Sequence, residues 1–153
     1  MTEGEWRREI GAALAFRERK PKEAISRLKR LAARTRRVAR QNLGEWHVEQ
    51  TLDLAAVLAA EAGQHGEAAA ALRRIVIHHE QAMAYHGHAL ASALMAVALE
   101  LFKIGNRAEA ARLGWRALRL LGTFPDPSPL LEKLLPQLRS YEQQRAKTGR
   151  RRR

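Results

Sequence analysis

The feature that most constrains the fold is a short phrase that occurs three times along the chain. It reads RKPKEAISRL at 19–28, GQHGEAAAAL at 63–72 and GNRAEAARL at 105–113. Each copy joins a turn signal to a Glu-Ala pair that opens an amphipathic run, which aligns Ala24, Ala68 and Ala110 at intervals of 44 and 42 residues. Self-similarity at such a period indicates a repeated structural unit.

A second set of alanines stands twelve residues before the first set, at Ala12, Ala56 and Ala98. Small side chains at paired positions let two antiparallel helices approach closely where they cross. The sequence therefore predicts helix–turn–helix hairpins that pack through alanine.

Composition agrees with an all-α fold of one domain in 153 residues. Apolar residues make up 46% of the chain and are mostly alanine and leucine, which favour helices. Aromatic residues, which favour strands, make up only 5%. The absence of cysteine excludes disulfides, thiolate catalysis and cysteine-based metal sites. No apolar run reaches the roughly 20 residues of a membrane span, and no secretory signal is visible. A cytoplasmic protein without membrane association is expected.

Seven helices are predicted, and their starts are marked by caps and prolines. Thr2, Asn42 and Asn106 are each followed three residues later by glutamate, the pattern of a capping box. Pro21 and Pro129 suit first helical positions. The predicted ranges are about 3–18, 21–40, 43–62, 66–80, 84–104, 107–121 and 128–146.

The repeat resembles the tetratricopeptide repeat, in which a small residue, a turn glycine and an alanine follow one another. Ala56, Gly63 and Ala68 match this pattern, as do Ala98, Gly105 and Ala110. The longer period is similar to that of kinesin-light-chain-type repeats. The resemblance implies a right-handed α–α superhelix of about three hairpins (3–40, 43–80 and 84–122), a capping helix (128–146) and a basic flexible tail (147–153). The alternative is an up-down helical bundle.

The resemblance also implies a protein or peptide partner, held on a concave face lined by the first helix of each pair. The residues expected toward that groove are Trp6, Glu9, Gln50, Asp53, Glu61, Ser92, Met95 and Lys103. Asp53 interrupts an apolar helix, and Met95 is an adaptable side chain suited to varied partners. The alternative is that each is an ordinary exposed or half-buried helix residue.

Charge is distributed as basic, acidic and basic segments, with +8 over 1–42, −5 over 43–102 and +9 over 103–153. A basic strip on one helix face consists of Arg27, Arg30, Arg34 and Arg37. Guanidinium forks bind carboxylate or phosphate bidentately, so the strip favours an acidic protein partner. The alternative is a nucleic-acid-associated accessory protein that binds the phosphate backbone through this strip and the C-terminal arginine tail.

Five histidines are expected near one edge of such a stack, at His47, His78, His79, His86 and His88. Together with nearby carboxylates they are candidate ligands for zinc or nickel, or a charge switch near neutral pH. Their spacing matches no metal motif, which favours ordinary exposed residues at helix ends.

Catalytic motifs are absent from the sequence, including a nucleophile elbow, a phosphate-binding glycine loop and a dinucleotide fingerprint. No enzymatic activity and no cofactor are expected. The stretch LLEKLLPQL at 130–138 presents a leucine face that either seals the last unit or docks a partner. Self-association is expected if that face is uncovered.

Overall fold

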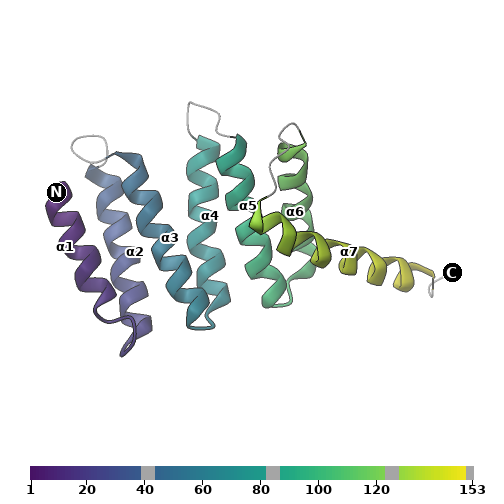
Figure 1. Ribbon diagram of the computed structural model, residues 1–153, viewed down its shortest axis with the longest axis horizontal. Helices are drawn as coiled ribbons and strands as arrows, with labels where there is room; N and C mark the ends of the chain where they lie inside the picture. Colours follow the sequence, from purple (N-terminus) through teal and green to yellow (C-terminus); the bar gives the residue numbers. More distant parts are fainter. Residues whose placement is uncertain (39–43, 82–86, 123–127, 151–153) are drawn as a thin grey trace. The chain divides into compact units, whose positions relative to one another are not determined.

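The computed structural model describes residues 1–38, 44–81, 87–122 and 128–150, and within these ranges the chain is all-helical, with no strand. The predicted all-α class is confirmed. No helix in these ranges is long and apolar enough to cross a bilayer. The described residues form seven successive helices: α1 (Glu3–Leu14), α2 (Pro21–Val38), α3 (Glu45–Glu61), α4 (His65–Gln81), α5 (Gly87–Lys103), α6 (Arg107–Leu121) and α7 (Pro129–Arg150) (Figure 1).

Three of the predicted helix starts are confirmed. The Thr2 backbone N–H donates to Glu5 Oε2 at 2.6 Å and Thr2 Oγ1 accepts from the Glu5 N–H at 3.2 Å, which closes a capping box. Pro21 and Pro129 open α2 and α7.

The two other predicted capping boxes have different outcomes. At α6 the prediction is wrong, because Asn106 Nδ2 donates to the Glu109 carboxylate at 2.9 Å and its side chain caps no backbone N–H. Asn42 lies outside the described residues, and α3 has Gly44 as its N-cap.

Two glycines make the turns between α3 and α4 and between α5 and α6. Gly63 has φ of 70° and Gly105 has φ of 81°. This left-handed region costs an L-residue roughly 1–2 kcal/mol because its Cβ meets the following carbonyl, whereas glycine has no Cβ. The turn positions predicted from the repeat are thus turns in the structure.

The chain forms two compact bodies, an N-terminal body (Met1–Ile75) and a C-terminal body (Val76–Arg153), and the boundary falls inside α4. In the N-terminal body α1 packs on α2 and α2 on α3, side by side (Figure 1). Their core is rich in alanine, since Ala24, Ala55, Ala59 and Ala68 are all without exposed surface. Few side-chain atoms separate these helices, which is what the repeat predicts.

The alanines aligned by the repeat are buried, with one exception. Ala24, Ala56 and Ala68 lie in the core of the N-terminal body, but Ala12 is exposed and its neighbour Ala13 is buried. The twelve-residue spacing is therefore wrong by one residue in the first repeat. There α1 ends at Leu14 instead of the predicted residue 18, so the connection to α2 is longer than a tight turn.

In the C-terminal body α5 packs on α6, and α7 crosses both helices (Figure 1). Ala98 and Ala110 are fully buried. Gly114 is the point of close approach to α7, since a Cβ built there would lie 3.1 Å from Leu138 Cδ2. Leu134 and Leu138 are also fully buried, so the leucine face of α7 is covered by the chain at these two positions. The condition for self-association through this face is not met there.

Replacing a turn glycine by alanine is expected to destabilise the protein. Gly63→Ala and Gly105→Ala should each lower the free energy of unfolding by about 1 kcal/mol, because alanine is strained at positive φ. Gly11→Ala serves as the control. Gly11 lies within α1 with open space around a built Cβ, so this change should stabilise by about 0.5–1 kcal/mol. Urea denaturation followed by circular dichroism measures all three, and equal effects at the three positions would contradict the turn assignment.

Filling the contact at Gly114 is expected to displace α7. Gly114→Leu adds side-chain atoms where a Cβ alone would already lie 3.1–3.4 Å from Leu138 and Leu134. Overpacking of this kind costs about 1–3 kcal/mol. The matched change Gly11→Leu meets open space and should stabilise slightly, as Gly11→Ala does, because leucine is also a good helix former. Thermal unfolding of both variants checks the difference, and an unchanged melting temperature for Gly114→Leu would show that α7 does not pack as described.

Candidate functional site: the arginine face of helix α2

Helix α2 separates apolar from cationic side chains because each kind recurs at three- and four-residue spacing. Its buried positions are Ala24, Ile25, Leu28, Leu31, Ala32 and Thr35. The four residues of the basic strip occupy a face of their own. Burial of the apolar positions against α1 and α3 fixes the rotation of α2, and this rotation holds the arginines at the surface.

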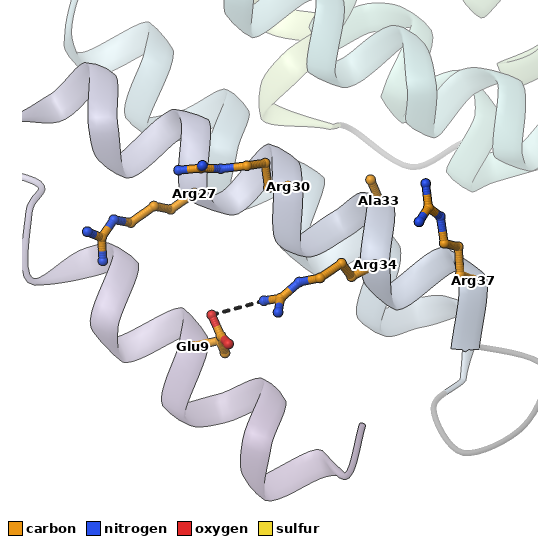
Figure 2. A pocket seen from close by; sticks show the side chains of 6 residues that line it. All are labelled: Glu9, Arg27, Arg30, Ala33, Arg34 and Arg37. Atoms are coloured by element: carbon orange, nitrogen blue, oxygen red, sulfur yellow. Dashed lines mark ion pairs between the residues drawn. The ribbon is translucent and has the colours of Figure 1, made fainter.

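An open hollow of about 570 Å³ lies at this face, between α1 and α2. All four arginines of the strip line it, together with Glu9 from α1 and Ala33 from α2 (Figure 2). The structure thus brings the whole predicted strip to one site. It also places Glu9, which was expected in a separate groove, beside the strip.

Two of the arginines are neutralised within the chain. Arg34 pairs with Glu9, with its Nη2 at 3.0 Å from the carboxylate (Figure 2). Arg27 donates from Nη2 and Nε to Glu23 at 2.8 and 3.2 Å, and its guanidinium also lies 4.0 Å from the centre of the Phe16 ring. The hydrogen bonds from Arg27 lower the pKa of Glu23.

Arg30 and Arg37 make no hydrogen bond or ion pair with any residue in the described part of the chain. Arg30 acts on Glu23 only through space, where its charge helps to lower the pKa of that carboxyl group. Both side chains are exposed. The site therefore holds two paired and two unpaired guanidinium groups.

Two further hollows adjoin the first. One of about 460 Å³ lies between α2 and α4, is lined by Lys22, Lys29 and Arg74 among others, and shares Arg30 and Ala33 with the first hollow. Lys29 pairs with Glu67 there and lowers the pKa of that carboxyl group through the hydrogen bond. The other, of about 630 Å³, lies along α1 and is lined by basic and acidic residues alike, namely Arg8, Arg34, Glu5 and Glu9, with Met1 and Ala12. The surface around α2 is predominantly cationic.

The other groove residues of the N-terminal body lie in different surroundings. Gln50, Asp53 and Glu61 are exposed on α3, and Glu61 pairs with Arg17 at 2.9 Å. Partial burial of its carboxyl group and then the charge of Glu49 raise the pKa of Asp53. The expectation for Trp6 is wrong, because this side chain is buried in the core.

The three residues of the C-terminal body that were predicted to line the groove differ in their exposure. Met95 is 0% exposed and belongs to the core, so it does not line an open surface. Ser92 is half-buried. Lys103 is exposed and pairs with Glu100 at 2.8 Å.

The candidate histidines do not form a metal site among the described residues, where no three His, Cys, Asp or Glu side chains are placed to hold an ion. His47 is buried, contrary to the expectation of an exposed residue. His78 and His79 are half-buried, with ring centres 5.8 Å apart, and His88 is exposed. His86 lies outside the described residues.

A cluster of aromatic rings at the start of α3 is not anticipated from the sequence. Trp6 Nε1 donates to Thr51 Oγ1 at 3.0 Å, and the His47 ring lies 4.8 Å from the Trp6 ring and 4.1 Å from the Trp46 ring. Trp46 itself is 50% exposed. Two features of the sequence could have indicated this cluster. A tryptophan needs a partner for its N–H when it is buried, and a threonine stands inside the apolar run of α3.

Comparison of the chain with protein-family models, with curated proteins and with solved structures gave no match. The tetratricopeptide resemblance therefore depends on the residues of the repeat alone. The site is accordingly interpreted from its own charges and contacts.

Replacing His47 by phenylalanine is expected to stabilise the protein. The Nδ1–H of His47 donates to the Gly44 carbonyl at 3.2 Å, which leaves the buried Nε2 an acceptor with no hydrogen-bond partner in the described chain. An unsatisfied buried polar atom costs about 1–3 kcal/mol and the lost hydrogen bond about 0.5–1.5, so His47→Phe should gain about 1 kcal/mol.

Trp6→Phe is the matched comparison within the same cluster. It removes the hydrogen bond to Thr51 and should lose at least about 1 kcal/mol. Urea denaturation measures both variants. A loss of stability in His47→Phe as large as that in Trp6→Phe would contradict the assignment of Nε2 as unsatisfied.

Proposed function

We propose that the chain is a protein-interaction module that binds an acidic protein or peptide segment at the arginine face of α2. The observation that carries the proposal is the gathering of four arginines around one open hollow, two of which have no carboxylate partner in the described chain. Guanidinium forks match the geometry of a carboxylate bidentately, and such charge-assisted bonds are the strong ones.

An acidic protein fits this surface better than a nucleic acid does. Glu9 lines the hollow and Glu23 lies beside it, so a phosphate backbone, which carries a charge at every nucleotide, would meet negative charge at two places. An acidic peptide can place its carboxylates at Arg30 and Arg37 alone. The aromatic ring next to the strip, Phe16, is covered by the Arg27 guanidinium, which leaves that face closed to a base. Binding of a phosphate backbone by the strip and the C-terminal arginine tail is the competing function.

The proposal includes the architecture implied by the tetratricopeptide resemblance, a right-handed superhelix of helical hairpins that carries the partner on a concave surface. Glu9, Gln50 and Asp53 are exposed residues of its expected first-helix face. The module acts without catalysis or cofactor, in the cytoplasm.

Neutralising the strip is expected to abolish most binding of an acidic probe. The variant Arg27→Gln/Arg30→Gln/Arg34→Gln/Arg37→Gln should bind a fluorescein-labelled glutamate-rich peptide about tenfold more weakly in fluorescence anisotropy at physiological salt. The control removes the same charge from exposed positions of α6 and α7, as Arg112→Gln/Arg119→Gln/Lys133→Gln/Arg139→Gln. It should retain nearly full affinity.

The outcomes separate the two functions. Equal weakening by both variants would reduce the effect to net charge and remove the proposed site. If duplex DNA binds more tightly than the peptide at the same salt, and the strip variant loses that binding, the nucleic-acid function replaces the one proposed.

A further inference from the structure

The arginine face of α2 consists of two rows. Seven residues are close to two helical turns, so side chains at this spacing lie about 10.5 Å apart along the axis and nearly on one line. Arg27 and Arg34 form one such row, and Arg30 and Arg37 form the other. The second row is rotated about 60° from the first around the helix.

The first row is already occupied by carboxylates of the same chain. Glu23 holds Arg27, and Glu9 reaches from α1 to Arg34. The second row has no such partner among the described residues. Figure 2 shows Arg34 directed at Glu9, whereas the guanidinium groups of Arg30 and Arg37 lie away from it.

Ala33 lies between the two unpaired arginines and is exposed. It borders both the hollow between α1 and α2 and the hollow between α2 and α4, and Arg30 also borders both. Along the helix axis, the smallest side chain of this surface therefore lies between the two unpaired arginines, beside their row and next to the hollow between α2 and α4. A small residue at such a point lets the backbone of another helix approach closely.

We infer that Arg30 and Arg37 form a two-point anchor for an acidic α-helix, which presents two carboxylates seven residues apart and a small side chain between them over Ala33. The inference rests on the proposed function and names the partner's chemistry. A helix aligned with α2 places residues seven apart at the same spacing of about 10.5 Å. An extended strand presents side chains on one face every 6–7 Å or so and does not match the two guanidinium groups.

The test compares two helical peptides of the same composition. Each has about 20 residues of alanine and glutamine, long enough to be helical, and two glutamates. In one peptide the glutamates are seven residues apart, and in the other they are five apart, which directs them to different faces. Circular dichroism verifies equal helicity. The peptide with the seven-residue spacing should bind the full chain about fivefold more tightly, as measured by isothermal titration calorimetry.

Two double variants with the same change of charge locate the anchor. Arg30→Gln/Arg37→Gln should remove the preference between the two peptides. It should also weaken binding of the peptide whose glutamates are seven residues apart about fivefold. Arg27→Gln/Arg34→Gln should retain the preference, because these arginines are engaged with Glu23 and Glu9. Circular dichroism and thermal melting of both variants verify that each remains folded.

Failure of the inference is distinct from failure of the proposed function. If both peptides bind equally and both double variants weaken binding alike, the two-point anchor is overturned while the basic face remains the site of acidic binding. If neither peptide binds, and the glutamate-rich peptide binds the variant without the four arginines as tightly as the original chain, both the anchor and the proposed function are contradicted. If the peptide whose glutamates are five residues apart binds more tightly, the two-point anchor is overturned and the proposed function is not.

Discussion

Close packing of helices through alanine is the constraint on which the rest of the structure depends. Where Ala24, Ala59 and Ala68 are buried, few side-chain atoms separate neighbouring helices, so helix axes approach and backbones lie near one another. Each alanine contributes little buried apolar area by itself. The alanines therefore set how closely the helices approach, whereas larger buried side chains such as Leu28 and Leu58 supply more of the buried apolar area.

The same packing determines what α2 presents to solvent. Ala24, Ile25 and Leu28 belong to one core cluster with residues of α1 and α3, and this cluster leaves α2 one rotation about its axis. With that rotation, the arginines at three- and four-residue spacing lie on the solvent-exposed side of α2. The geometry of the site is thus a consequence of the core, and the arginines themselves contribute little to holding the fold.

Helices with both apolar and charged faces were predictable from the sequence, because a period of 3.6 residues identifies the buried side. The helix class, most of the starts and the turn glycines follow from such local signals. Met95 was not predictable in this way, since α5 is apolar almost all round and its pattern selects no exposed face. Trp6 is buried against Leu31, and its N–H donates to Thr51, 45 residues away. Contacts between residues so far apart in the chain cannot be read from the periodicity of the sequence. The pairing of Glu9 with Arg34 also joins two helices, so it appears only when α1 and α2 are placed together.

The arginine face carries an electrostatic cost that the fold does not remove. Like charges three and four residues apart on a helix repel each other by a few tenths of a kcal/mol. Glu23 and Glu9 relieve this repulsion for one row of arginines, but Arg30 and Arg37 form no ion pair in the described chain. Exposed ion pairs stabilise a protein only weakly, so the face gains little for the folded chain by itself. An acidic partner would relieve the remaining repulsion and add its own hydrogen bonds, and both effects would increase its affinity for this face.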